Sequence, residues 1–258
     1  MARNCLPRVL IMQTTRPTTN ASHFLLSKLL GVLLLVLLSP HSLASGGLPA
    51  FLAEYTVSRN GSEIGVRTHR LSKTDKSYLY EARMHTTGLA SFIKPGTITE
   101  RSHWRLIQQR VVPHKYEYLD SSDEDRNSFL DFDWRNNSVM NHVGNKPWQM
   151  PIPDGTQDKF GYMIALMQDL QKGNTEPEYR IADGGRLKTY RFKALGNEVI
   201  ATPAGKFNTL KLRGTREDKK NPVTYIWCLP EKNYLPVKIE RHRKDTVYTM
   251  SLNRLEGL

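Results

Sequence analysis

Histidine is the residue type in this sequence best suited to acid–base or metal chemistry. Six histidines follow residue 44, and they are His69, His85, His103, His114, His142 and His242. None of them belongs to an HExxH, HxH or Cys/His metal-binding pattern. Because they fall in segments with strand-like alternation, we interpret them as ordinary sheet residues, and we predict no metal and no other cofactor.

Carboxylates are the second possible source of chemistry. The run Asp120–Asp125 concentrates acidic residues, but it lacks the central Gly and terminal Glu of an EF-hand calcium loop, so we interpret it as a solvated loop. Asp131 and Asp133 alternate with aromatic residues in one predicted strand. A spacing of two within a strand is too common to indicate the paired carboxylates of a glycosidase.

Nucleophile patterns are missing from the sequence. It contains no G-x-S-x-G elbow, no complete set of S-x-x-K, S-D-N and K-T-G motifs, and no glycine-rich phosphate loop between a strand and a helix. Cys228 is the one cysteine after residue 44, so it has no partner for an internal disulfide. It lies in the apolar stretch Tyr225–Leu229, and we predict a buried small hydrophobic side chain.

The first 44 residues have the pattern of an export signal. Basic residues precede an unbroken apolar run, Leu29–Leu38, which is followed by Pro40 and by Ser42-Leu43-Ala44. This run is about half as long as the roughly 20 residues of a membrane-spanning helix, so the pattern favours a cleaved signal over a retained anchor. We predict cleavage after Ala44 and a periplasmic location. Translation could start at Met1 or at Met12.

Cleavage would leave residues 45–258, a length that suits one domain with a substantial core. The removed segment carries four Lys or Arg and no Asp or Glu, so the formal charge would fall from +12 to +8. A basic exported protein is attracted to anionic partners such as lipid head groups and other envelope components. We expect no nucleic-acid partner and no transmembrane segment in the mature chain.

Short alternating segments separated by turn residues dominate residues 45–258 and are typical of antiparallel sheets. The first segment, residues 51–58, meets Asn60-Gly61, a strong hairpin signal. The other predicted strands are 63–66, 77–87, 97–108, 111–119, 127–134, 138–143, 178–182, 188–194, 198–201, 206–214, 223–229, 235–241 and 247–255. The pattern predicts a mainly β fold of about a dozen strands, in a large curved antiparallel sheet or an open barrel.

One segment, residues 158–172, has helical rather than strand periodicity. Its apolar residues are Phe160, Met163, Ile164, Met167 and Leu170, which have the spacing of an amphipathic helix. Gly173 suits a left-handed helix terminator. A single helix in a chain of strands must pack its apolar stripe on the sheet, and the proline-rich stretch 145–155 is predicted to be a stiff connector leading into it.

Several short stretches together resemble a bacterial family known as domain of unknown function 3108 (DUF3108). They are Ala53-Glu54-Tyr55, Asn60-Gly61, Ile64-Gly65, Thr86–Leu89, Pro113 with Tyr116, Thr202–Gly205 with Phe207 and Thr209, and Tyr234–Ile239. The resemblance implies an exported, mostly antiparallel protein of the bacterial envelope and supplies no catalytic residues. More loosely, a curved sheet with a helix on its concave face is similar to periplasmic lipoprotein carriers.

These features favour a non-enzymatic periplasmic protein that holds an apolar or amphipathic ligand, such as a lipid, between a curved sheet and the helix. The predicted ligand-binding residues are Tyr55, Phe160, Met163, Met167 and Trp227. Two alternatives stay open. One is an envelope polysaccharide hydrolase using carboxylates such as Glu54, Asp131 or Asp133, and the other is an interaction scaffold in envelope assembly.

Overall fold

The computed structural model describes residues 48–258 apart from 75, 89–90, 93–94, 144–145 and 218–221. The predicted export signal and its cleavage position after Ala44 lie outside the described residues. The first half of the described chain contains strands β1 (Phe51–Arg59), β2 (Ser62–Lys73), β3 (Tyr78–Thr86), β4 (Thr97–Ile107), β5 (Arg110–Asp120), β6 (Ser128–Asp133), β7 (Ser138–Val143) and β8 (Lys146–Pro151). The second half contains β9 (Gln157–Asp158), helix α3 (Tyr162–Gln171), β10 (Glu178–Asp183), β11 (Arg186–Thr202), β12 (Gly205–Arg216), β13 (Val223–Leu229), β14 (Leu235–Arg243) and β15 (Thr246–Gly257).

All of these strands belong to one fifteen-stranded sheet in which strands consecutive in the chain are neighbours, except β8 and β9, which lie at its two ends. The order is β8-β7-β6-β5-β4-β3-β2-β1-β15-β14-β13-β12-β11-β10-β9, so the pairing of β1 with β15 joins the two halves of the chain. The described pairings are antiparallel except for β9 with β10. The order ends at β8 and β9, and the sheet does not close into a barrel. The predicted mainly β fold with one helix is confirmed, with more strands than expected.

Local sequence signals explain much of this arrangement. The β1–β2 hairpin turns at Asn60 and Gly61, which both have positive φ values, 49° and 84°, as a tight primed turn requires. The predicted strands 188–194 and 198–201 are one strand, β11, with a register shift between Ala194 and Gly196. An irregularity of this kind interrupts the alternation in the sequence without ending the strand.

The predicted connector at residues 145–155 contains strand β8, so this part of the prediction is wrong. β8 lies at the edge of the sheet and pairs on one side only, with β7. Pro147 and Pro151 lack the N–H that a second neighbour would need, and proline in a sheet is therefore confined to such edges. The prolines predicted a break in the sheet, whereas they mark its last strand.

Helix α3 begins at Tyr162, four residues later than the predicted start at Asp158. Asp158 lies in β9, and its carboxylate accepts hydrogen bonds from the backbone N–H groups of Phe160 (2.8 Å) and Gly161 (2.5 Å). These bonds form the turn into the helix rather than a regular helical turn. The helix ends where Gly173 adopts a φ of 82°. No helix in the described part of the chain has the length and apolar character needed to cross a bilayer.

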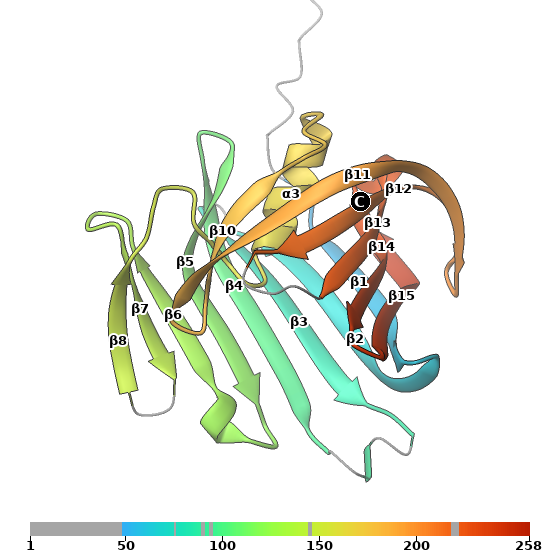
Figure 1. The fold of residues 1–258 in the computed structure, drawn as a ribbon, viewed down its shortest axis with the longest axis horizontal. Helices are drawn as coiled ribbons and strands as arrows, with labels where there is room; N and C mark the ends of the chain where they lie inside the picture. The colour runs from blue at the N-terminus through green and yellow to red at the C-terminus, as the bar shows by residue number, and fades with distance from the viewer. Residues whose placement is uncertain (1–47, 75, 89–90, 93–94, 144–145, 218–221) are drawn as a thin grey trace, which may run out of the picture. The chain divides into compact units, whose positions relative to one another are not determined.

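The sheet curls so that strands from both of its halves, such as β5 and β10, lie around α3 (Figure 1). On one side Gln157 of β9 donates a hydrogen bond to the carbonyl of Val111 in β5 (2.8 Å). On the other side Tyr179 of β10 donates to Asp169 on α3 (2.6 Å). The buried helix residues are Met163, Ile164, Ala165, Leu166, Met167, Gln168 and Leu170, so α3 is covered over most of its circumference.

The two faces of the sheet differ in chemistry. In β1 every second residue from Phe51 to Val57 is buried, which is the alternation expected when one face of a strand meets the core. The outer face carries ion pairs across strands, such as Arg101 with Glu81 (2.6 Å) and with Glu117 (3.5 Å). The inner face therefore forms the core. Helix α3 packs on this face, and the cavity lies between the two.

Candidate ligand-binding cavity

A cavity of about 470 Å³ lies between the inner face of the sheet and the start of α3. Inward-pointing residues of adjacent strands form one side of it, and Lys159, Phe160, Tyr162 and Met163 form the other. Most lining residues of β1 to β4 and β11 to β15 share one face of their strand, because only alternate side chains point inward. In β12 three consecutive residues, Gly214, Thr215 and Arg216, line the cavity. Apolar side chains among them are Val57, Met84, Phe192, Ile239 and Met250.

One wall of the cavity depends on a glycine. A Cβ added at Gly214 of β12 would lie 2.7 Å from Cε1 of Phe192, closer than side chains tolerate. Phe192 and Gly214 are register partners on β11 and β12. The missing side chain at Gly214 thus lets the Phe192 ring lie against the neighbouring strand, and both residues line the cavity.

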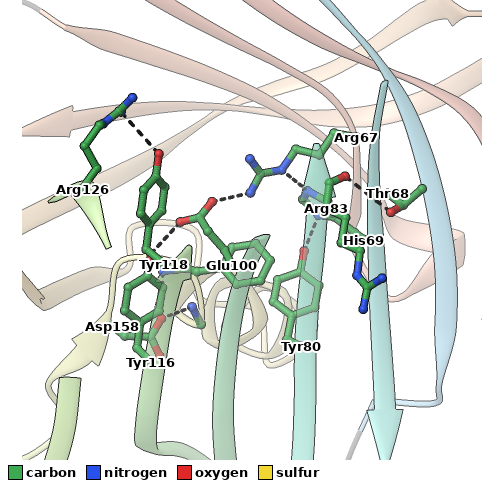
Figure 2. Close-up of polar contacts among 12 residues, drawn as sticks. Arg67, Thr68, His69, Tyr80, Arg83, Glu100, Tyr116, Tyr118, Arg126 and Asp158 are labelled. Atoms are coloured by element: carbon green, nitrogen blue, oxygen red, sulfur yellow. Dashed lines mark hydrogen bonds and ion pairs between the residues drawn. The ribbon is translucent and has the colours of Figure 1, made fainter. Parts of the chain in front are cut away.

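A polar network crosses one part of the cavity wall (Figure 2). The guanidinium of Arg67 pairs with the carboxylate of Glu100, and its Nε donates to Nε2 of His69 (2.9 Å). The second oxygen of Glu100 accepts a hydrogen bond from Tyr116 (2.7 Å). The other ring nitrogen of His69, Nδ1, lies 2.6 Å from the Tyr80 hydroxyl. Four strands, β2 to β5, contribute to this network.

His69 is a neutral imidazole in this network. Burial and the neighbouring Arg67 guanidinium hold the pKa of His69 well below its usual value. Because Arg67 can only donate, Nε2 of His69 must accept, and the imidazole proton is on Nδ1. His69 is consequently a hydrogen-bonding residue rather than a charged one.

Glu100 is ionised, and Lys159 contributes to this. Burial raises the pKa of Glu100, but Arg67 and Lys159 outweigh that effect, so the pKa lies below its usual value. The Lys159 ammonium also lies 5.3 Å from the ring centroid of Tyr116 and 4.3 Å from that of Tyr118, within the range of cation–π contacts. Lys159 is therefore held beside the network and lines the cavity.

Asp158 lies next to this region but does not line the cavity. Ser102 donates a hydrogen bond to its Oδ2 (2.6 Å), and its Oδ1 accepts the N–H groups of Phe160 and Gly161. Burial raises the pKa of Asp158 to about 6, against the opposing effect of these hydrogen bonds. Its geometry is that of a capping residue that positions Phe160 over the cavity.

The structure brings two of the five predicted binding residues to the cavity, Phe160 and Met163. Tyr55 faces inward but lies behind His69, with ring centroids 5.0 Å apart, and its hydroxyl donates to the carbonyl of Pro236 (2.8 Å). Met167, one turn beyond Met163, is completely buried in the core. Neither of these two side chains reaches the cavity.

Trp227 lies on the opposite face of the sheet from the cavity. Its strand neighbour Ile226 points inward, whereas the Trp227 ring is covered by the ammonium groups of Lys211 (4.9 Å) and Lys238 (4.8 Å), its partners on adjacent strands. The ring nitrogen donates to Glu198 (3.1 Å). Since every residue from Tyr225 to Leu229 is apolar, the sequence did not indicate which face was the inner one.

The carboxylates considered for a hydrolase do not line the cavity either. Glu54 lies 3.9 Å from Arg254 in an ion pair, and Asp131 is exposed. Asp133 is exposed and binds the backbone N–H groups of Arg135 and Asn136 in a turn. Among the described residues, no group of three or more His, Cys, Asp or Glu is arranged to hold a metal ion.

Sequence reasoning missed Arg67, Glu100 and Tyr80. The predicted second strand stopped at residue 66, although the alternation continues through Arg67, His69 and Leu71 to the end of β2. A charged residue at an inward position inside such an alternation was the available signal. It would have indicated a polar site on the inner face.

Comparisons with known proteins identify a family and one solved structure of similar fold. The family model described as "Protein of unknown function (DUF3108)" matches residues 54–253. Among solved structures, the chain is similar to a β-barrel-like protein of domain of unknown function DUF1849 from Brucella abortus, with a TM-score of 0.56 and 9% identity over 82% of this chain and 99% of that one. A protein from Bacteroides fragilis with a YmcC-like fold has a TM-score of 0.35 and 11% identity over 81% and 97%. No curated protein matches the chain.

Proposed function

Because the chain belongs to the DUF3108 family, whose function is unknown, we propose a function from the cavity itself: an exported, non-enzymatic protein that binds an apolar or amphipathic ligand. The observation that carries this proposal is the cavity of about 470 Å³ between the sheet and α3. Small-molecule sites in proteins typically have volumes of about 300–1,000 Å³ and mostly apolar walls with a few polar groups. The cavity fits that description.

The apolar lining suits a flexible ligand. Three methionines, Met84, Met163 and Met250, line the cavity, and methionine is unbranched and adapts its shape to what it contacts. A wall of this kind fits an alkyl or acyl chain better than it fits a rigid, highly polar metabolite. The proposed ligand is therefore lipid-like.

The polar groups of the cavity favour binding over catalysis. Glu100 is occupied by Arg67 and Tyr116, and His69 is a neutral imidazole held between Arg67 and Tyr80. A general acid or base needs a proton that it can exchange near the working pH. The pKa values of Glu100 and His69 are both lowered, so neither pKa is shifted toward neutral pH.

Export is part of the proposal and is supported by the sequence. The apolar run Leu29–Leu38 and the small residues Ser42 and Ala44 support cleavage after Ala44. We infer that the binding protein acts in the periplasm, where lipids and lipidated molecules cross between two membranes. The test is the mass of the protein recovered from the periplasmic fraction of cells expressing residues 1–258. A chain beginning at Ser45 is expected, and an uncleaved chain retained in the cytoplasm would contradict export.

Ligand binding is tested by filling the cavity with a tryptophan. Met250 lines the cavity from β15, whereas its neighbour Thr249 points to the other face of the sheet. We expect the neutral probe N-phenyl-1-naphthylamine to become fluorescent on binding to residues 45–258, and Met250→Trp to weaken that binding roughly tenfold or more. Thr249→Trp is the matched control and should bind the probe as the unsubstituted protein does.

Two outcomes would overturn the proposal. The first is the absence of probe binding by a folded protein, with no lipid found by mass spectrometry in material purified from the periplasm. The second is equal binding by Met250→Trp and Thr249→Trp while both variants show the far-UV circular dichroism of the unsubstituted protein. That result would place the probe on another surface.

A further inference from the structure

The hydroxyl of Tyr80 has a proton that no described residue accepts. Arg67 donates to Nε2 of His69, so the imidazole proton is on Nδ1 and is donated to the Tyr80 oxygen. The hydroxyl proton of Tyr80 then points elsewhere, and no acceptor for it lies among the described residues. Tyr80 is 2% exposed and lines the cavity. A buried donor without a partner is costly, and a ligand oxygen in the cavity would satisfy it.

Arg67 also has unused donors. Its guanidinium has five N–H groups, of which one serves His69 and one serves Glu100. No other described residue accepts from it. The side chain is 15% exposed, and it lines the cavity beside Tyr80. Arg67 and Tyr80 together thus present hydrogen-bond donors to the same cavity.

The charge around these donors is positive. Arg67 and Lys159 carry two positive charges, and Glu100 carries the one negative charge that is in direct contact with this cluster. The other carboxylate that lines the cavity, Asp183, pairs with Lys188 at 2.5 Å. Because the wall has a low dielectric constant, the attraction between this excess positive charge and an anion is stronger than it would be in water.

The mouth of the cavity adds to the positive charge. Arg241 lines the cavity and is exposed, and it makes no ion pair with a described carboxylate. Its partners on the neighbouring strands, Thr224 and Tyr248, also line the cavity. An anion approaching from solvent meets a cation before it reaches Arg67.

We propose that the ligand is an anionic amphiphile whose head-group oxygens accept hydrogen bonds from Tyr80 and Arg67 beside Lys159, while its chain lies against the methionines of the cavity. This inference rests on the proposed function and adds the chemistry of the head group. A carboxylate and a phosphate both provide anionic oxygens. A quaternary ammonium head would be attracted by the aromatic rings of Tyr80 and Phe160 but repelled by two cations.

The experiment compares amphiphiles that share a dodecyl chain and differ in the head group. Dodecanoate, dodecyl phosphate, dodecanol and dodecyltrimethylammonium compete with N-phenyl-1-naphthylamine for residues 45–258, each below its micelle concentration. We expect the anions to bind roughly tenfold or more tightly than dodecanol, and the cation to bind most weakly. The ratio of dodecanoate to dodecyl phosphate distinguishes a free fatty acid from a phospholipid source.

Substitutions locate the head group. Tyr80→Phe and Lys159→Met should each weaken dodecanoate binding roughly tenfold and leave dodecanol binding within about twofold. Tyr55→Phe is the matched control, because it also removes one buried hydroxyl but lies behind His69 and outside the cavity. It should change neither ligand's affinity.

Each remaining outcome overturns a defined part of the inference. Equal binding of dodecanol and the anions, or anion binding unaffected by Tyr80→Phe and Lys159→Met, removes the anionic head group and leaves the apolar cavity function standing. Tightest binding of dodecyltrimethylammonium reverses the sign of the head group. Failure of all four amphiphiles and of the probe removes the proposed function as well.

Discussion

The ring of Phe160 lies stacked on the ring of Tyr80, with centroids 4.1 Å apart and planes 5° from parallel. Phe160 comes from the turn before α3 and Tyr80 from β3, so this contact joins the segment that leads into the helix to the sheet at the cavity. The Arg67 guanidinium lies 5.8 Å from the same Phe160 ring. One aromatic side chain therefore covers the polar network and forms part of the apolar wall.

Replacement of Phe160 by alanine should destabilise the protein by about 3 kcal/mol, as is typical of buried Phe→Ala changes. The variant loses the stack on Tyr80 and enlarges the cavity. Urea denaturation of residues 45–258 measures the change. Phe92→Ala is the control, because Phe92 is 86% exposed and its removal should change the free energy of unfolding by less than about 0.5 kcal/mol. Similar losses in the two variants would contradict the stacked arrangement.

A second prediction concerns the contact between the edge strand β8 and the β10–β11 turn. A Cβ at Gly185 would overlap the indole of Trp148, whereas a Cβ at Gly184 would meet open space. Both glycines have positive φ, 70° and 59°, so alanine at either site costs about 1–2 kcal/mol of backbone strain. Gly185→Ala should destabilise the protein by roughly a further 1–3 kcal/mol, because its new Cβ would clash with the Trp148 indole.

The Trp148→Ala background separates these two effects. There Gly185→Ala and Gly184→Ala should destabilise the protein equally, as measured by urea denaturation. If Gly185→Ala lowers the free energy of unfolding by the same amount with and without Trp148, the edge strand and the turn do not touch in solution.

Sequence patterns predicted the strands well, because each strand presents one face to the core and the alternation is visible in residue types. In β1 the buried residues are those that the pattern placed on one face. Asn60-Gly61 predicted a turn whose φ values are positive at both residues. These features depend on residues close in the chain, and local physics determines them.

The composition of the cavity was harder to predict because it depends on which strands meet. The helical spacing selected Phe160 and Met163, which line the cavity, together with Met167, which is fully buried and does not line it. Arg67 reads in the sequence as one more basic residue. Its role appears only when Glu100, 33 residues later, is brought beside it by the β2–β3–β4 order.

A third prediction concerns the reactivity of Cys228. The side chain is completely buried on β13, and burial raises the pKa of the thiol, so little thiolate is available to react. We expect residues 45–258 to react with Ellman's reagent only after unfolding in guanidinium chloride. An introduced Ser58→Cys, at a half-buried position on the outer face of β1, should react without denaturant and serves as the positive control. Rapid reaction of the native thiol would contradict its burial.

The last prediction is a pH dependence carried by Asp158. Its pKa is about 6 in the folded protein, raised by burial from an ordinary value of 3.8, so the folded state binds a proton more tightly than the unfolded state does. This group therefore contributes most to stability below about pH 4, and its contribution falls as the pH rises to about 6. The free energy of unfolding changes by at most about 3 kcal/mol over this range. His69 acts in the opposite direction below about pH 6.5, because its pKa is lowered and the unfolded state binds the proton instead.

A difference measurement isolates the Asp158 contribution, since His69 is present in both proteins. Asp158→Asn keeps the oxygen that accepts the N–H groups of Phe160 and Gly161, and its amide can donate to Ser102. Relative to the unsubstituted protein, the variant should gain stability as the pH rises from 4 to 6 and keep that advantage at pH 7. Asp154→Asn, which removes a carboxylate at an exposed position instead, is the control. A flat difference for Asp158→Asn across this window would mean that the Asp158 carboxyl is not buried as the structure has it.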